Sequence, residues 1–222
     1  MRVAIIGAGL SGLSCALELE RYNIKPVIFE KRAHAGEALD FSVVWPIIMN
    51  RAITDPLKYL KKEYNLELAP LNHIKKIIMY SPSSKSVERG SLGYIFIRGF
   101  PDYALEKQLL SYVKSPIIFN RYIELEDMRN KFDFIVVATS NSIIASNLDM
   151  WTDTFIAHAR IATIVGKFNP TEIIMWLNTE YAKNGFCYLV PKSDKEACLV
   201  QIVNGITCNE MDYYWKRFLL VE

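Results

Sequence analysis

The chain has 222 residues and a formal net charge of +2, and 51% of its residues are hydrophobic against 23% charged. This composition is typical of one sizeable packed domain, or of a domain with a smaller partner, and it excludes a disordered chain. The weak charge, without a long basic cluster, predicts no nucleic-acid partner. We find neither a leader pattern nor the about 18–20 uninterrupted apolar residues of a transmembrane segment, and therefore expect a cytoplasmic protein.

Cysteine and histidine patterns give no indication of a metal site or a catalytic constellation. The four cysteines show no C-x-x-C spacing, and the three histidines stand apart from one another along the chain. We therefore predict reduced thiols rather than disulfides, and no metal site. No Ser/His/Asp or Cys/His arrangement stands out, so the catalytic residues remain unassigned.

The first predicted element is a strand over 2–6, followed by three glycines and by apolar residues at helical spacing from Leu10 onward. This order predicts a parallel strand, a tight turn and a helix. In such an arrangement Gly7 permits the turn, Gly9 lets the backbone approach a diphosphate, and Gly12 lets the helix pack closely against the strand.

The beginning of this helix is the predicted diphosphate site. The N–H groups of Leu10, Ser11 and Gly12 lack an intrahelical acceptor, and the helix dipole favours negative charge beside them. We therefore expect a cradle formed by the whole loop: Gly7, Ala8, Gly9, Leu10, Ser11 and Gly12.

A second parallel strand is predicted over 23–30, "NIKPVIFE", and it ends in Glu30. A carboxylate at that position can accept hydrogen bonds from an adenosine ribose, and its charge disfavours a 2′-phosphate. The glycine pattern alone would be weak, but the strand, the helix and Glu30 agree with it, so we predict dinucleotide binding. The alternative is a tight turn without a ligand.

The rest of the chain alternates short helices with many strands. The next elements, in chain order, are a helix over 53–64, strands over 73–80, 85–88 and 93–98 separated by turns at 81–84 and 89–93, and a helix over 102–113. Two further strands, 116–120 and 134–139, are expected to return to the nucleotide-binding sheet, with Tyr122 passing the adenine.

The second half reads mainly as strands of a mixed or antiparallel sheet, over 153–168, 172–178, 186–191 and 197–203. A closing helix over 209–220 has Asn209 as its expected cap. Several large apolar residues here could line an apolar substrate cavity: Trp151, Met175, Trp176, Phe186 and Tyr188. Because apolar residues at alternating strand positions usually belong to the hydrophobic core, a core position is the favoured interpretation for each of them.

Two segments resemble flavoproteins of the two-dinucleotide type. "KRAHAGEAL", after Glu30, resembles the stretch in which a basic residue and a glycine turn lie along FAD, although position 37 is not the usual second glycine. "KFDFIVVATS", residues 131–140, resembles a strand whose end reaches the cofactor, with Ser140 in place of a glycine. The resemblance implies these cofactor contacts: Lys31, Arg32, Gly36, Ala138 and Thr139.

The chain resembles the geranylgeranyl reductase family, which is related to the para-hydroxybenzoate hydroxylase type of flavoprotein. Residues 93–113 are similar to the strand, arginine and helix start of that group, and Arg98 matches an arginine near the flavin or its pyrophosphate. An ordinary salt-bridged surface arginine is the alternative. Residues 184–205 resemble a strand, turn and return strand of the substrate half.

This resemblance implies an α/β protein with a Rossmann-like (GR2-type) FAD/NAD(P)-binding domain and an inserted and following mixed β-sheet substrate domain. We expect a discontinuous FAD-binding domain at 1–80 and 93–140, and a substrate-type sheet region at 81–92 and 141–222. The family closes its FAD domain with a Gly-Asp segment, and none of the ten glycines here precedes an aspartate. We therefore expect either a natural short form or a truncated piece.

The function implied is that of an FAD-dependent oxidoreductase, a reductase or monooxygenase-like enzyme acting on a hydrophobic, lipid-like small molecule such as an isoprenoid. NAD(P)H or another donor would supply the electrons. One alternative is a non-redox binding module of the same fold. The other is an NAD-dependent oxidoreductase or NAD-binding regulatory domain, with Glu30 on the NAD ribose.

Overall fold

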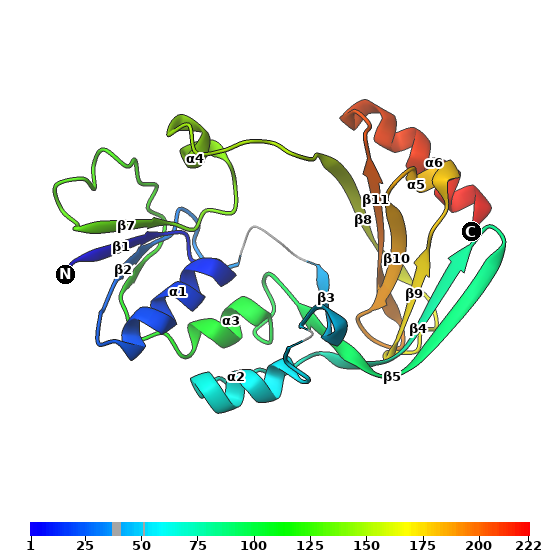
Figure 1. Ribbon diagram of the computed structural model, residues 1–222, viewed down its shortest axis with the longest axis horizontal. Helices are drawn as coiled ribbons and strands as arrows, with labels where there is room; N and C mark the ends of the chain where they lie inside the picture. The colour runs from blue at the N-terminus through cyan, green and yellow to red at the C-terminus, as the bar shows by residue number, and fades with distance from the viewer. Residues whose placement is uncertain (37–40, 51) are drawn as a thin grey trace. The chain divides into compact units, whose positions relative to one another are not determined.

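The computed structural model describes residues 1–36, 41–50 and 52–222 (Figure 1). The chain divides into two compact units, each built from several stretches of sequence. The first unit comprises Met1–Asp40, Leu57–Ala69 and Ile97–Thr152, and the second comprises Phe41–Pro56, Pro70–Phe96 and Asp153–Glu222.

Sheet A forms the centre of the first unit. Its strand order is β6-β2-β1-β7, and β1 pairs with β2 and β7, and β2 with β6, in parallel. The strands are β1 (Val3–Ile6), β2 (Val27–Phe29), β6 (Ile117–Ile118) and β7 (Phe134–Val137). The helices are α1 (Leu10–Arg21), α2 (Pro56–Tyr64), α3 (Leu105–Leu110) and α4 (Ile143–Asn147), and α1 and α3 lie side by side (Figure 1).

The β-branched run of β1 is buried along its whole length, as the central position of this strand requires. On one face of sheet A, apolar side chains of β1 and β2 pack against the chain segment that precedes β7; the buried members are Ala4, Ile6, Phe29, Ile123 and Met128. The parallel sheet and the helix that follows β1 confirm the predicted α/β, Rossmann-like fold.

Sheet B forms the second unit, with strand order β3-β5-β4-β9-β10-β11-β8. Its strands are β3 (Ser42–Pro46), β4 (Asn72–Ser81), β5 (Ser84–Ile97), β8 (Ala157–Val165), β9 (Glu172–Trp176), β10 (Phe186–Pro191) and β11 (Glu196–Asn204). The sheet is mixed because β4 pairs with β9 in parallel, whereas β10 pairs with β9 and β11 in antiparallel fashion. This confirms the expected mixed sheet.

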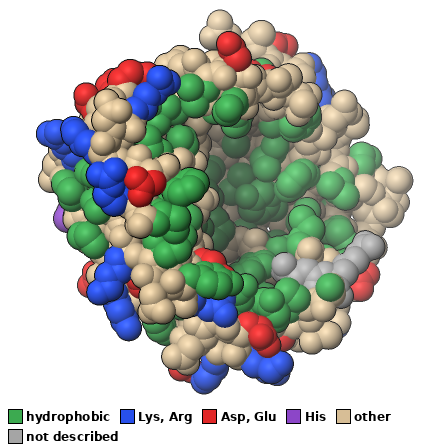
Figure 2. Space-filling view, turned by 60° about the vertical axis from the view of Figure 1, so that its left-hand side comes forward, with side chains coloured by type: hydrophobic (Ala, Val, Ile, Leu, Met, Phe, Trp, Pro, Cys, Tyr) green, Lys and Arg blue, Asp and Glu red, His purple; other side chains and the backbone are tan. Residues whose placement is uncertain are grey.

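Charged side chains of both signs are interspersed on the face of the molecule shown in Figure 2. Within the described part of the chain, no helix is both long and apolar enough to cross a membrane.

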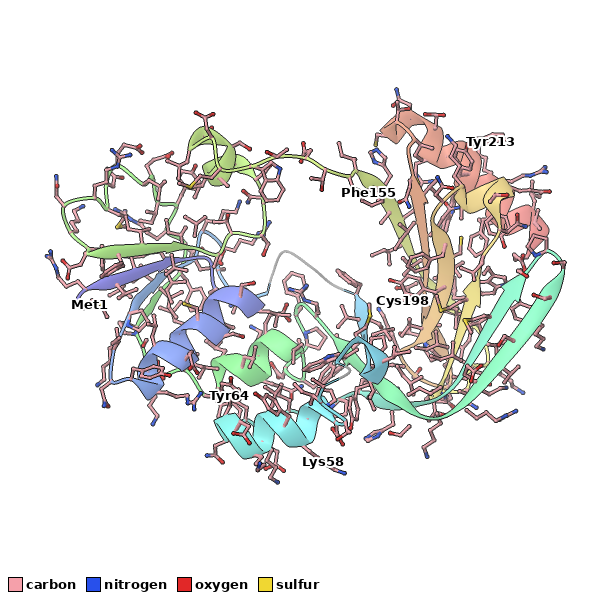
Figure 3. All side chains as sticks on the ribbon, viewed as in Figure 1. Met1, Lys58, Tyr64, Phe155, Cys198 and Tyr213 are labelled. Atoms are coloured by element: carbon pink, nitrogen blue, oxygen red, sulfur yellow. The ribbon has the colours of Figure 1, made fainter. Side chains whose placement is uncertain are left out.

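One face of sheet B is covered by α5 (Thr179–Ala182) and α6 (Met211–Val221); the remaining short helices of this unit are η1 (Ile47–Asn50) and η2 (Cys208–Glu210). Phe218 of α6 packs against Trp176 and Tyr181, whereas Tyr213 of the same helix is exposed (Figure 3). The fully buried Gln201 side chain donates through Nε2 to the carbonyls of Tyr181 and Tyr214, at 2.8 and 2.9 Å. This amide therefore ties both helices to β11.

Two local expectations were wrong. The predicted turn at 89–93 is part of one continuous strand, β5, because pairing with β4 continues on both sides of a register shift. Gly93 has φ +152°, and a Cβ there would collide with the Trp45 carbonyl of β3. The glycine thus serves close strand packing rather than a turn. The expected cap Asn209 lies inside the short helix η2 that precedes α6. Thr207 caps η2 in a reciprocal capping box with Glu210.

The division between the units differs from the expected domain boundaries. Residues 41–56, 70–80 and 93–96 belong to the second unit, because β3, β4 and β5 are strands of sheet B. Residues 141–152, which include α4, belong to the first unit.

Candidate dinucleotide-binding site

The turn between β1 and α1 is built on two glycines that have no room for a side chain. Gly7 has φ +109°, and a Cβ there would lie 2.5 Å from the Ala138 carbonyl oxygen. A Cβ at Gly12 would collide with the carbonyl of Gly7 and lie 3.3 Å from Cγ2 of Ile5. The structural reasons predicted for Gly7 and Gly12, a tight turn and close helix packing, therefore agree with the geometry.

Gly9 is different, because its environment within the protein is open. It precedes α1 with φ −82°, and no described atom lies within 4 Å of a Cβ built on it. The first helical hydrogen bond here runs from the Leu13 N–H to the Gly9 carbonyl at 3.0 Å. The preceding N–H groups of α1 are thus available beside an open space. This cradle, which a Cβ would partly fill, fits a diphosphate.

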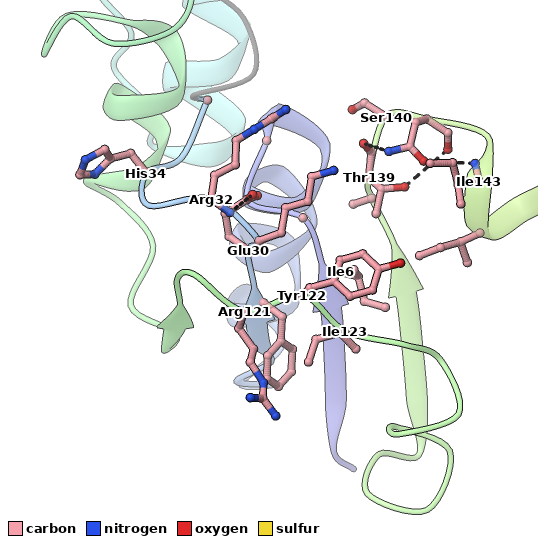
Figure 4. A pocket seen from close by; sticks show the side chains of 18 of the residues that line it. Ile6, Glu30, Arg32, His34, Arg121, Tyr122, Ile123, Thr139, Ser140 and Ile143 are labelled. Atoms are coloured by element: carbon pink, nitrogen blue, oxygen red, sulfur yellow. Dashed lines mark hydrogen bonds between the residues drawn. The ribbon is translucent and has the colours of Figure 1, made fainter.

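Glu30 follows β2 and is buried, with 9% of its surface exposed. Its Oε2 accepts a hydrogen bond from the Ala8 N–H at 2.8 Å. Its Oε1 accepts one from the Arg32 N–H at 2.9 Å (Figure 4). Each carboxylate oxygen can accept a further hydrogen bond. The side chain therefore fixes the backbone on both sides while keeping acceptor capacity for ribose hydroxyls.

One pocket of the first unit collects most of the predicted site. The predicted residues in its wall are Gly7, Gly9, Glu30, Lys31, Arg32, Gly36, Arg98, Tyr122, Ala138 and Thr139. Four predicted residues are not part of the wall: Ala8, Leu10, Ser11 and Gly12. Ala8 and Gly12 are buried behind it, whereas Ser11 is exposed. Position 37 lies outside the described residues.

The same pocket has wall residues that the sequence did not reveal: Ile6, Phe29, His34, Arg121, Ile123, Ser140, Asn141, Ile143 and Ile144. Arg121 is brought there by backbone pairing, since its N–H donates to the Glu30 carbonyl at 2.9 Å. In the sequence, the only indication that Arg121 would line the site was its neighbour Tyr122, which was predicted to pass the adenine. Ile143 and Ile144 belong to α4, a helix without a sequence signature. Ser140 has φ +57°, a conformation that suits the glycine expected there.

Arg98 lies at the part of the wall that includes Gly36. Its Nε donates to Oε1 of Glu106 at 2.6 Å, with 20% of the Arg98 side chain and none of the Glu106 side chain exposed. Arg98 is therefore ion-paired, as one alternative held, but it belongs to the pocket wall rather than to the open surface, and its partner Glu106 is buried.

The charged residues of the wall are predominantly basic. Lys31, Arg32, Arg98 and Arg121 line it together with one carboxylate, Glu30. An excess of positive charge around a pocket favours an anionic ligand. Within the described residues we find no group of three or more His, Cys, Asp or Glu side chains that could hold a metal ion.

Comparison with known proteins agrees with this geometry. Residues 5–46 match the family described as NAD(P)-binding Rossmann-like domain. Over 42 residues the chain is 50% identical to the glutamate synthase [NADPH] small chain of Halomonas elongata, a match that covers 19% of this chain and 9% of that protein.

Solved structures match nearly the whole chain. A geranylgeranyl bacteriochlorophyll reductase-like protein from Thermoplasma acidophilum superposes with a TM-score of 0.68 at 16% identity, covering 99% of this chain and 61% of that one. CtdE in complex with FAD superposes with a TM-score of 0.59 at 14% identity, covering 93% and 60%. The chain shares their fold. The predicted resemblance is thereby confirmed at the level of fold, and the chain spans about three fifths of the length of these two proteins.

Proposed function

We propose that this chain forms the FAD-binding part of a flavin-dependent oxidoreductase. The observation that carries the proposal is the open space beside Gly9 at the start of α1, in a pocket whose wall also holds the buried Glu30. A main-chain cradle and a nearby carboxylate acceptor are what a diphosphate and its attached ribose require.

The residues have separate roles in this proposal. The N–H groups of Leu10, Ser11 and Gly12 hold the diphosphate, and Glu30 accepts hydrogen bonds from the adenosine ribose. The adenine lies among apolar residues of the wall beyond Glu30, such as Ile123 and Ile143, with Tyr122 beside it. Bound FAD would supply hydride and electron transfer, while the protein supplies orientation and exclusion of water.

FAD is favoured over NAD by the similar fold of CtdE, whose structure is a complex with FAD. NAD is the second candidate, because the matching family description and the Halomonas relative both name NAD(P) or NADPH. Glu30 would serve either ribose. For the NAD candidate, the charge of Glu30 would disfavour the 2′-phosphate of NADP.

Calorimetric titration of the purified, ligand-free chain with FAD and NAD in parallel separates the candidates. We expect FAD to bind and NAD to bind more weakly. Gly9→Val should abolish FAD binding, since its side chain would occupy the diphosphate space. Binding of NAD alone would favour the second candidate, and full FAD binding by Gly9→Val would refute the assigned cradle.

We further propose that the enzyme acts on an apolar small molecule bound by the second unit, with NAD(P)H or another donor supplying the electrons. Support comes from the face of sheet B opposite α5 and α6. Tyr188, Val200 and Ile161 share that face because each lies opposite the next across the β10–β11–β8 pairings. Ile161 is 42% exposed there. On the same face, Tyr188 and its cross-strand neighbour Met175 pack against a core cluster, as expected for alternating strand positions, so Ile161 marks an exposed part of this face.

Calorimetry with farnesol, an isoprenoid alcohol, tests the substrate class. We expect Ile161→Lys to weaken binding, because a cation on this face must be desolvated. Leu220→Lys, at an exposed apolar position of α6, is the control and should bind as the unchanged chain does. Equal effects of the two substitutions would contradict the proposed face.

A further inference from the structure

We propose that Glu106 is a positioning residue that holds the Arg98 guanidinium in place to bind a phosphate of the ligand. The inference rests on the proposed function and adds to it a residue outside the glycine loop and outside the pocket wall. Glu106 is absent from the lining of the pocket, whereas Arg98 belongs to it.

The first observation is the burial of Glu106. It lies in the first turn of α3 with no exposed surface, and its Oε1 accepts the hydrogen bond from Nε of Arg98 at 2.6 Å. Its Oε2 has no hydrogen-bond partner among the described residues. A buried carboxylate is costly unless it is paired. Within the described part of the chain, its side chain forms its ion pair and hydrogen bond with Arg98 alone.

The second observation concerns the other end of Arg98. Because Nε is engaged by Glu106, the plane of the guanidinium is fixed, and its two terminal nitrogens still carry four N–H donors. No described residue accepts a hydrogen bond from them. They belong to a side chain that is 20% exposed, in the wall of the candidate pocket. A fixed fork of donors at such a place matches the oxygens of a phosphate.

The third observation links Glu106 to the loop after β2. Gly36 has φ +76°, and a Cβ on it would lie 2.8 Å from Cγ of Glu106. The loop that carries Lys31 and Arg32 therefore packs directly on the buried carboxylate. Glu106 is held from one side by this loop and from the other by Arg98, so the position of the guanidinium follows from the position of the carboxylate.

Calorimetry with ADP, adenosine and FAD tests the proposal, using Arg98→Met, Glu106→Gln, Glu106→Asp and Glu106→Met. Glutamine keeps an acceptor oxygen at the same distance from the backbone, within reach of Nε of Arg98. Aspartate keeps the negative charge, but its side chain is one methylene shorter, so the carboxylate lies farther from Arg98. We expect Arg98→Met and Glu106→Met to weaken ADP and FAD binding by about tenfold each, from the loss of one charge-assisted hydrogen bond. Adenosine, which has no phosphate, should bind each variant as it binds the unchanged chain.

The comparison of Glu106→Gln with Glu106→Asp separates positioning from simple charge compensation. Positioning predicts that the glutamine variant binds ADP better than the aspartate variant, and that Arg98→Met combined with Glu106→Met loses no more than either alone. Tighter ADP binding by the aspartate variant, or ADP binding at the unchanged affinity in every Glu106 variant, would overturn the proposal.

Other outcomes have equally definite readings. Loss for FAD without loss for ADP would place Arg98 at the flavin and overturn the phosphate assignment. An unchanged chain that binds ADP but not FAD would refute the proposed function and leave this inference standing. An unchanged chain that binds neither would refute both. Thermal unfolding of each variant shows whether it is folded, and the conservative Glu106→Gln variant keeps the test decisive if Glu106→Met does not fold.

Discussion

The carboxylate of Glu30 accepts a hydrogen bond from the backbone N–H of Ala8 at 2.8 Å, which joins the end of β2 to the loop after β1. The residue expected to hold the ribose therefore also holds the glycine loop. Its second hydrogen bond, from the Arg32 N–H, fixes the chain that follows β2. This double use explains why an acidic side chain is kept buried at this position.

Replacing Glu30 by glutamine should destabilise the first unit. The amide nitrogen would face a backbone N–H in place of one of the two acceptor oxygens, so one buried donor would lose its partner. We expect a decrease in unfolding free energy of about 1–3 kcal/mol. Urea denaturation measures it. Glu18→Gln is the control, because Glu18 forms an exposed pair with Arg21 and its loss should change stability little. Equal stability of the two variants would contradict the finding.

Alanine at Gly9 and at Gly12 should have opposite consequences, although the two positions are only three residues apart. The Gly9 site has open space for a Cβ, so Gly9→Ala should fold with nearly unchanged stability and bind FAD more weakly. Gly12→Ala should lose about 1–3 kcal/mol of stability, because its Cβ collides with the Gly7 carbonyl. Thermal unfolding and FAD titration of both variants provide the comparison, and destabilisation by Gly9→Ala would count against the open cradle.

The opening of the fold could be predicted because its determinants are local. A β-branched strand, glycines with distinct steric demands and a carboxylate after the next strand lie within the first 30 residues. The path of residues 89–93 could not be predicted, because their strand conformation is imposed by β4 and by the approach of β3 to Gly93. Gly90 and Gly93 favour a turn locally, but pairing with the neighbouring strands outweighs this preference.

The candidate site shows the same limit. Arg121 and Ile143 reach the pocket from segments whose place is set by the return of β6 and β7 to sheet A, and neither has a pattern of its own. Glu106 lies in a short helix, and no motif marks it in the sequence. Its burial depends on Gly36, 70 positions earlier in the sequence, and on Arg98. Such relationships need the tertiary structure.

Stability at alkaline pH should depend on Tyr94. Burial, followed by the hydrogen bond from its hydroxyl to Oδ1 of Asp55 at 2.9 Å, raises the pKa of Tyr94 from 10.0 to about 12. A raised pKa means that the folded state holds the proton more tightly. The protonated Tyr94 hydroxyl therefore contributes its full stabilisation of the folded state below about pH 10. This stabilisation is lost as the pH rises through 12.

Tyr94→Phe tests this dependence. The variant cannot ionise at this position, so its unfolding free energy should fall less between pH 10 and 12 than that of the unchanged chain. Denaturant titrations at several pH values in that interval measure the difference. Parallel pH profiles for the two proteins would show that Tyr94 does not contribute.

Thiol reactivity should distinguish the four cysteines. Cys208 is exposed, whereas Cys187 and Cys198 are buried in sheet B (Figure 3 labels Cys198). Burial raises the pKa of the Cys187 thiol to about 12, which suppresses the reactive thiolate at neutral pH. Burial also raises the pKa of the partly exposed Cys15.

A thiol-reactive dye at pH 8 should therefore label the native chain fastest at Cys208. The Cys208→Ser variant should lack this fastest phase of the labelling reaction. All four cysteines should react after denaturation. Rapid native labelling of Cys187 would contradict the described packing of β10.

The most direct test of the central claim is a crystal structure of the chain with ADP. We predict that the diphosphate lies against the first N–H groups of α1, beside Gly9, and that a ribose hydroxyl donates to the Glu30 carboxylate. ADP bound elsewhere, with solvent alone in the Gly9 cradle, would contradict the account.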